Sequence, residues 1–158
     1  MALEIERKFL VIDESWRGGV SAKISLQQAY LARTERLSAR VRIIGGTDAL
    51  LAIKSSGAGA VRSEYEYAIP VGDARELMEL RQGALIEKTR HIVGQGSARW
   101  EVDVFGGGLA GLVIAEIELA TVDAAFARPP WLGREVTGDP AYYNAALALA
   151  GLPAGATI

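Results

Sequence analysis

Short runs in which apolar and polar residues alternate fill most of the chain, and such alternation places successive side chains on opposite faces of a strand. Glycine-rich segments separate these runs, as turns with positive φ do between the strands of hairpins. The pattern predicts strands over residues 3–11, 26–33, 38–45, 49–55, 62–69, 86–93, 99–105 and 112–120. We therefore expect a sheet built mainly from antiparallel hairpins.

Two segments show helical spacing instead. Residues 73–82 carry apolar residues at intervals of three and four, which predicts an amphipathic helix. Residues 142–150 follow Asp139 and Pro140, which suit an N-cap and the first position of a helix. The chain thus combines many short strands with few helices, which is typical of an α+β protein.

One face of nearly every predicted strand is ionic. Glu4, Glu6 and Lys8 share a face, because residues two apart point the same way. A solvated face would mix uncharged polar residues with charges, and same-sign neighbours repel unless counter-charges or ligands face them. These positions hold eight carboxylates (Glu4, Glu6, Glu64, Glu66, Glu101, Asp103, Glu116, Glu118) and six cations (Lys8, Arg40, Arg42, Lys54, Lys88, Arg90). We predict a closed eight-stranded antiparallel β-barrel with a charged interior and a few outer helices.

The composition limits the chemistry that this interior can carry out. A chain of 158 residues fits a single domain over 1–158. The absence of cysteine and the single histidine, His91, exclude thiol catalysis and metal sites built from those residues. A net charge of −2 argues against general nucleic-acid binding. Without a recognisable signal peptide or an unbroken apolar span, we expect a cytoplasmic protein with no membrane partner.

The clustered charges indicate a particular ligand. Arg and Lys suit phosphate oxygens, and carboxylates suit Mg²⁺ or Mn²⁺. Eight carboxylates against six cations leave the interior net negative, so we expect a divalent ion to be required before a polyphosphate binds. By the same balance, Arg40 and Arg42 are each expected to stabilise the empty barrel. Loss of the Glu116 charge is expected to relieve repulsion.

Motifs in fixed order along the chain resemble those of a known family. They are E-x-E-x-K at 4–8, R-x-R at 40–42, a lysine strand at 52–54, E-x-E at 64–66, K-x-R at 88–90, and acidic strands at 100–105 and 115–119. On these residues the chain is similar to the CYTH superfamily, the triphosphate tunnel metalloenzymes. It is most similar to the short-chain bacterial inorganic triphosphatases.

The resemblance implies metal-dependent hydrolysis of a triphosphate, first of all inorganic tripolyphosphate to pyrophosphate and phosphate. It implies that Glu4, Glu6, Glu116 and Glu118 hold Mg²⁺ or Mn²⁺. It implies that phosphates are bound by Lys8, Arg40, Arg42, Lys54, Lys88 and Arg90, supported by Glu64, Glu66, Glu101 and Asp103.

Residues outside these motifs are predicted as follows. Tyr30, beside Lys8 in the tunnel, is placed either to aid proton transfer or simply to pack in the barrel. His91 falls on the opposite strand face from Lys88 and Arg90, so we expect it outside the tunnel in a structural role. Trp16, Trp131, Tyr142 and Tyr143 are expected in the outer core.

Three other functions stay open at this point. A class IV-type adenylate cyclase would need an adenine pocket, for which no dedicated polar or aromatic set is visible. A thiamine triphosphatase would use the same tunnel. A non-enzymatic polyphosphate-binding module would not need both acidic pairs, at 4/6 and 116/118. In each case the expected partner is a small-molecule triphosphate, and a homodimer is compatible with the sequence.

Overall fold

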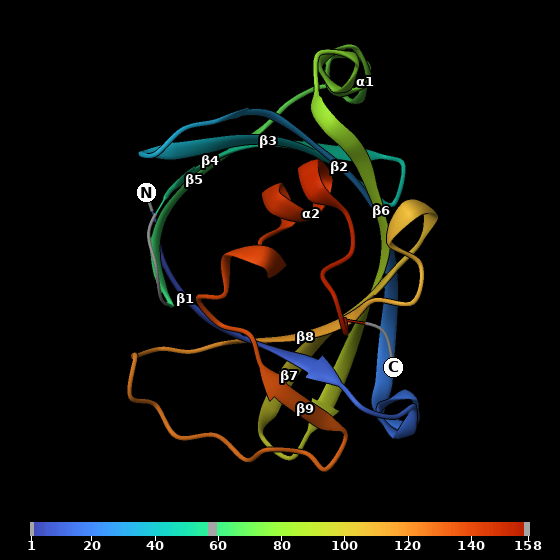
Figure 1. Ribbon diagram of the computed structural model, residues 1–158, viewed down its shortest axis with the longest axis vertical. Helices are drawn as coiled ribbons and strands as arrows, with labels where there is room; N and C mark the ends of the chain where they lie inside the picture. The colour runs from blue at the N-terminus through green and yellow to red at the C-terminus, as the bar shows by residue number, and fades with distance from the viewer. Residues whose placement is uncertain (1, 57–59, 157–158) are drawn as a thin grey trace.

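The protein is an antiparallel β-barrel, as the alternating pattern predicts. The computed structural model describes residues 2–56 and 60–156. Its strands are β1 (Ala2–Val11), β2 (Val20–Arg33), β3 (Leu37–Ile44), β4 (Asp48–Ser55), β5 (Val61–Ala68), β6 (Gln82–Gln95), β7 (Ala98–Phe105), β8 (Val113–Glu118) and β9 (Leu132–Glu135). They pair in the order β5-β4-β3-β2-β6-β7-β8-β1-β9, and β5 also pairs with β1 (Figure 1). That last pairing closes an eight-stranded ring, which confirms the predicted fold class.

β2 and β6 are each six residues longer than predicted, and β9 was missed. β2 begins at Val20, because it pairs with β6 along a register that runs from Val20 opposite Val93 to Tyr30 opposite Gln82. β9 was not predicted, because four residues are too few to show alternation. β5 pairs with β1 from Ala2 to Ile5, and β9 pairs with Phe9 and Val11 further along the same edge of β1.

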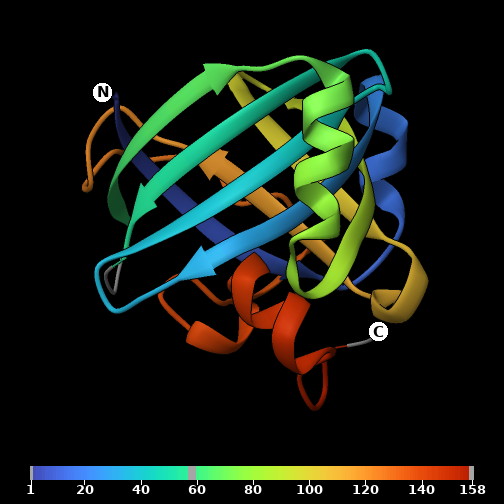
Figure 2. The same cartoon turned by 90° about the horizontal axis from the view of Figure 1, so that it is seen from above.

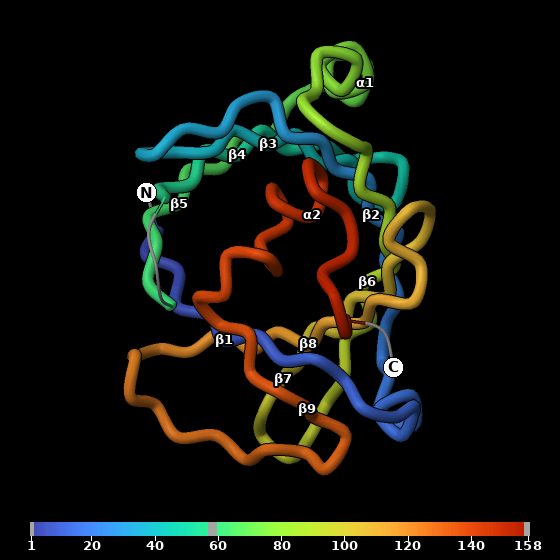
Figure 3. The backbone as a smooth tube through the Cα atoms, in the orientation of Figure 1, coloured from blue at the N-terminus to red at the C-terminus, as the bar shows by residue number. Residues whose placement is uncertain are grey.

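The outer wall of the barrel is largely apolar, as expected from the inward-facing charges, and helices cover parts of it while Leu3, Tyr65 and Tyr67 stay exposed. Helix α1 (Val71–Glu79) packs Ala74 and Met78 against Val41 and Ile43. On the opposite wall, the 3₁₀ helix η1 (Ser15–Gly19) adds Trp16 to a second buried apolar cluster. Figure 3 shows that the long segment between β8 and β9 also runs outside the ring of strands. None of the helices within 2–56 and 60–156 is long and apolar enough to span a membrane.

The C-terminal helices lie over one end of the barrel. The 3₁₀ helix η3 (Pro140–Tyr142) begins at Asp139, whose side chain accepts a hydrogen bond from the Ala141 amide, and α2 (Asn144–Ala150) follows. Figure 1 shows α2 in the middle of the ring, and Figure 2, turned by 90°, shows it below the strands.

Apolar side chains hold α2 in this position. Leu147 belongs to one buried cluster with Tyr30 and Ile86 of the barrel wall. The approach of the helix to β6 requires glycine at position 83, where a Cβ atom would collide with the carbonyl of Ala148. α2 therefore gives this end of the interior an apolar floor, and charged side chains line the space next to it.

Candidate active site

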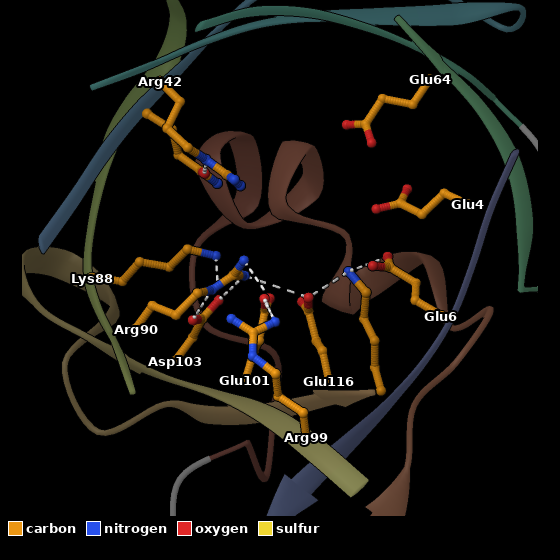
Figure 4. A network of polar contacts seen from close by, with 12 residues as sticks. Glu4, Glu6, Arg42, Glu64, Lys88, Arg90, Arg99, Glu101, Asp103 and Glu116 are labelled. Atoms are coloured by element: carbon orange, nitrogen blue, oxygen red, sulfur yellow. Dashed lines mark hydrogen bonds and ion pairs between the residues drawn. The ribbon is translucent and has the colours of Figure 1, made fainter. Parts of the chain in front are cut away.

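The charged faces of the strands line one cavity of about 340 Å³. Figure 4 shows side chains from many strands converging on the interior of the barrel. The predicted residues in its wall are Glu4, Glu6, Lys8, Arg40, Arg42, Lys54, Glu64, Glu66, Arg90, Glu101, Glu116 and Glu118. Lys88 and Asp103 project inward as well but are fully buried, and Tyr30 lies nearer α2. The structure thus brings together the charges that strand alternation placed on one face.

The register between β1 and β8 sets the acidic side of the site. Glu6 lies directly opposite Glu118, and Lys8 lies directly opposite Glu116. The Lys8 Nζ atom is 3.4 Å from Glu116 Oε1 and 3.5 Å from Glu6 Oε1. Burial lowers the pKa of Lys8, but the two carboxylates outweigh it, so the net pKa is raised and the ammonium form is strongly favoured.

Glu116 is held as a carboxylate by cations. Burial raises its pKa, but Lys8 and Arg90 outweigh that effect, and the net pKa lies well below the usual range. Arg90 Nη2 is 3.5 Å from Glu116 Oε2. The expectation that repulsion dominates at Glu116 is therefore wrong, because its nearest charged groups are of opposite sign.

β6 and β7 contribute a buried network of ion pairs. Lys88 Nζ is 2.5 Å from Asp103 Oδ2, and Arg90 binds both oxygens of the same carboxylate at 2.8 Å. Arg90 also reaches Glu101 at 2.5 Å, so one guanidinium links three acidic side chains (Figure 4). Burial, together with Arg90 and Arg42, lowers the pKa of Lys88 to about 8 despite the Asp103 carboxylate.

The two arginines of β3 differ in their surroundings. Arg40 Nη2 is 3.4 Å from Glu64 Oε1, and the nearby Tyr30 and Glu64 outweigh burial to raise the pKa of Arg40. Arg42 instead donates a hydrogen bond from Nε to the amide oxygen of Gln28 at 3.0 Å. Burial and the neighbouring guanidinium groups lower the pKa of Arg42 to about 10. These surroundings favour a stabilising role in the ligand-free barrel for Arg40 but not for Arg42.

β4 and β5 contribute the remaining charged side chains of the tunnel wall. Lys54 Nζ is 2.6 Å from Glu4 Oε2 and 3.9 Å from Glu64 Oε1. Burial and the neighbouring Glu6 raise the pKa of Glu4, against the effect of Lys54. Every lysine that lines the main cavity is thus paired with a carboxylate that the sequence assigns to metal or supporting roles.

The chemistry of the donor set fits a hard divalent cation. Its ligand atoms are all carboxylate oxygens, which Mg²⁺ and Mn²⁺ prefer. Like charges stand directly opposite each other where Glu6 faces Glu118 and where Glu101 faces Glu116, an arrangement that a bound cation would stabilise. Within residues 2–56 and 60–156, no three acidic side chains are already close enough to form a preassembled metal site.

Three residues outside the charged set occupy informative positions. Tyr30 lies opposite Arg40 in the pairing of β2 with β3. Tyr30 also contributes to the raised pKa of Lys8, and the two residues line the same cavity. The structure therefore brings Tyr30 and Lys8 together. His91 packs against Trp16 at a ring distance of 5.0 Å and lies outside the tunnel, as predicted. Tyr143 was expected in the outer core, and this is wrong: it lines a second cavity near the covered end.

That second cavity adds residues that the sequence analysis missed. It has a volume of about 80 Å³ beside the start of α2, and Arg33, Arg62 and Tyr143 are part of its wall. Arg62 could have been found, because it precedes Glu64 by two residues and so shares its face. Gln28 was missed as well, although alternation places it on the same face as Tyr30. Tyr143 carries no such signal.

The structure is a closed antiparallel barrel whose interior is lined by ionic side chains. This is the tunnel architecture that the resemblance of the motifs implies. The chain belongs to the CYTH domain family, whose profile matches residues 2–143. Membership implies dependence on a divalent metal ion.

Characterised relatives agree with this assignment. An inorganic triphosphatase of Acetivibrio thermocellus is 43% identical over 148 residues, 93% of this chain and 94% of that protein. An inorganic triphosphatase of Nitrosomonas europaea is 41% identical, over 92% of this chain and 97% of the relative. The crystal structure of an inorganic triphosphatase superposes with a TM-score of 0.71 at 38% identity, covering 97% of this chain and 98% of that one.

Proposed function

We propose that the protein is a metal-dependent inorganic triphosphatase that converts tripolyphosphate and water into pyrophosphate and phosphate. The observation that carries this proposal is the register of β1 and β8, which sets Glu6 against Glu118 and Lys8 against Glu116. Paired carboxylates suited to a divalent ion thus lie beside cations suited to phosphate in one enclosed space. The relatives named inorganic triphosphatase support the same substrate.

In this proposal the metal is held by the two acidic pairs, Glu4 with Glu6 and Glu116 with Glu118. When bound, Mg²⁺ or Mn²⁺ would neutralise charge on the phosphate oxygens and make an attacking water more acidic. Glu4 forms an ion pair with Lys54, and Glu116 forms one with Lys8. These carboxylates would have to exchange the lysines for the metal ion, which would leave both ammonium groups free for the substrate.

The phosphates are bound by the six cations of the motifs. Arg90 is held in place by bidentate contact with Asp103, which fixes its guanidinium before the substrate arrives. Lys8, Arg40, Arg42, Lys54 and Lys88 complete the set. As the terminal phosphoryl group is transferred to water, charge grows on its oxygens, and positioned cations stabilise that charge.

The remaining carboxylates orient the cations. Glu64 contacts Arg40 and Lys54, and Asp103 contacts Lys88 and Arg90. Glu101 extends the same network through Arg90, and Glu66 belongs to the same wall. Their removal should therefore weaken phosphate binding indirectly.

Lys8 and Tyr30 are the proposed proton-transfer pair. Tyr30 lies between the charged part of the tunnel and the apolar floor, and it influences both Lys8 and Arg40. In this role the phenol oxygen accepts a proton from the attacking water while its own hydroxyl proton passes to the leaving pyrophosphate oxygen, and Lys8 stabilises the charge that develops. Tyr30→Phe should lower kcat while leaving KM nearly unchanged.

We also propose that residues 1–158 form one functional domain, although the family profile ends at residue 143. The support is the packing of α2, whose Leu147 lies in the same buried cluster as Tyr30. Truncation before α2 should therefore expose the floor of the tunnel and reduce stability and activity together.

A turnover panel tests the function. Tripolyphosphate, pyrophosphate, ATP and thiamine triphosphate are supplied in turn with Mg²⁺, with Mn²⁺, or with a chelator, and released phosphate is measured. The proposal requires fastest turnover of tripolyphosphate and none with chelator. Cyclic AMP formed from ATP would indicate a cyclase, faster turnover of thiamine triphosphate a thiamine triphosphatase, and binding without any turnover a polyphosphate-binding module.

A further inference from the structure

Arg42 differs from the other five cations of the motifs in its partner. Each of the others forms an ion pair with at least one carboxylate of the tunnel: Lys8, Arg40, Lys54, Lys88 and Arg90. Arg42 forms no ion pair with the carboxylates that the structure describes, and its Nε atom donates instead to the amide oxygen of Gln28 at 3.0 Å. The partner of Arg42 is therefore polar but uncharged.

More distant charges do not compensate Arg42 either. Burial and the guanidinium groups of Arg40 and Arg90 lower its pKa to about 10, and they outweigh the opposite effects of Tyr30 and Asp103. With this pKa Arg42 is still protonated at neutral pH. An anion can therefore bind Arg42 without first breaking an ion pair, which is not so for the other five cations.

Gln28 lies behind Arg42 and away from the cavity. The two residues stand opposite each other in the pairing of β2 with β3, and the Gln28 side chain is fully buried. Arg42 is part of the wall of the main cavity and points into the interior (Figure 4), whereas Gln28 lies outside that wall. A hydrogen bond at Nε leaves the two terminal nitrogens of the guanidinium available for phosphate oxygens.

We propose that Gln28 is a positioning residue, which orients Arg42 toward the substrate and leaves its positive charge uncompensated. A carboxylate at the same place would also orient the arginine, as Asp103 orients Arg90, but it would neutralise part of the charge. The inference deepens the proposed function and rests on it for the identity of the substrate. What it adds is a reason for an amide, and not an acid, at position 28.

Gln28→Glu tests the importance of the uncharged partner, because it changes the charge of the side chain and almost nothing of its shape. The KM of tripolyphosphate should rise about tenfold while kcat changes little. Gln27→Glu is the matched control, because Gln27 is the next residue, is exposed and lies on the outer face of β2. It adds the same charge to the protein and should leave the KM unchanged. An unchanged KM in Gln28→Glu, or an equal rise in Gln27→Glu, overturns the proposal.

Thermal unfolding in chelator tests the charge of Arg42 without substrate or turnover. Gln28→Glu should unfold at or above the temperature of the wild type, because the new carboxylate pairs with Arg42. In an Arg42→Gln background the same change should lower the unfolding temperature, because the carboxylate is then buried without that partner. An equal fall in both backgrounds would show that Arg42 offers no uncompensated charge, and would overturn the proposal.

Gln28→Met tests the orienting role, because it keeps the length of the side chain and removes the acceptor. It should raise the KM of tripolyphosphate in the wild type but not in the Arg42→Gln background. Equal rises in the two backgrounds would make Gln28 a packing residue only. If the wild type does not hydrolyse tripolyphosphate, the proposed function fails, and the unfolding comparison still decides whether Gln28 leaves the charge of Arg42 uncompensated.

Discussion

Lys88 and Asp103 form an ion pair of 2.5 Å in the part of the tunnel that solvent does not reach, with side-chain exposures of 0% and 1%. The pair is not isolated, because Arg90 shares the Asp103 carboxylate. The single Asp103 carboxylate therefore forms ion pairs with two cations, so the positive charge of Lys88 is only partly compensated. Burial, together with Arg90 as a second cation on the same carboxylate, lowers the pKa of Lys88 to about 8, while Lys88 and Arg90 outweigh burial and lower the pKa of Asp103.

The first prediction concerns pH. As pH rises through about 8, Lys88 loses its proton in the empty tunnel, so the KM of tripolyphosphate should rise over this range. Lys88→Arg should flatten that rise, because a guanidinium remains charged. The stability of the empty protein should respond in the opposite direction. Between about 8 and the usual value of 10.5 the unfolded chain binds more protons at this residue, so this group adds to the free energy of unfolding as pH increases.

The second prediction concerns Glu116. Glu116→Gln should abolish turnover and also destabilise the empty protein by about 3 kcal/mol, since it leaves Lys8 and Arg90 with a buried partner missing. Thermal unfolding of the two proteins in chelator measures the difference. Glu66→Gln is the control, because Glu66 is exposed and should change the unfolding temperature little. An unfolding temperature for Glu116→Gln at or above that of the wild type would contradict the prediction.

The third prediction separates neighbouring arginines. Arg40→Gln should lower the unfolding temperature of the empty protein, because Arg40 is paired with Glu64. Arg42→Gln should leave it unchanged or raise it, because Arg42 is buried among other cations. Both variants should nevertheless raise the KM of tripolyphosphate. Equal destabilisation by the two substitutions would show that the surroundings of Arg42 have been misjudged.

The fourth prediction concerns metal. Mg²⁺ or Mn²⁺ alone should raise the unfolding temperature, because a ligand that binds only the folded protein stabilises it and the opposed Glu6 and Glu118 supply such a site. Glu118→Gln should reduce this rise, whereas Glu76→Gln on the exposed face of α1 should not. Removal of metal by a chelator should stop hydrolysis of tripolyphosphate. Hydrolysis at full rate in chelator would refute the metal dependence.

Alternation predicted most of the barrel because the physics of a strand is local. Successive side chains point to opposite faces, so the eight main strands and their charged faces follow from residue spacing alone. The same rule would have added Arg62 to the site. β9 could not be predicted in this way, because its pairing depends on the edge of β1 that β5 leaves free.

The electrostatics of the site depend on cross-strand neighbours, which spacing does not reveal. Arg40 and Arg42 look alike in the sequence, but one lies opposite Tyr30 and near Glu64, while the other lies opposite Gln28. The position of Tyr143 was equally inaccessible, because a short apolar helix packs as well on the wall of a barrel as over its end. Such distinctions arise only when strands distant in sequence are brought into register.

The double use of β1 has a consequence for how the chain folds. Its first half pairs with β5, its second half pairs with β9, and its other edge pairs with β8. Among the strands of this barrel β1 is synthesised before the others, so it must wait for β5, β8 and β9 before its edges are satisfied. The long-range contacts that close the tunnel form late, which favours slow folding and leaves the edges of β1 exposed during synthesis. The charged residues of that strand, Glu4, Glu6 and Lys8, then serve a second purpose, since charges on an unpaired edge discourage aggregation.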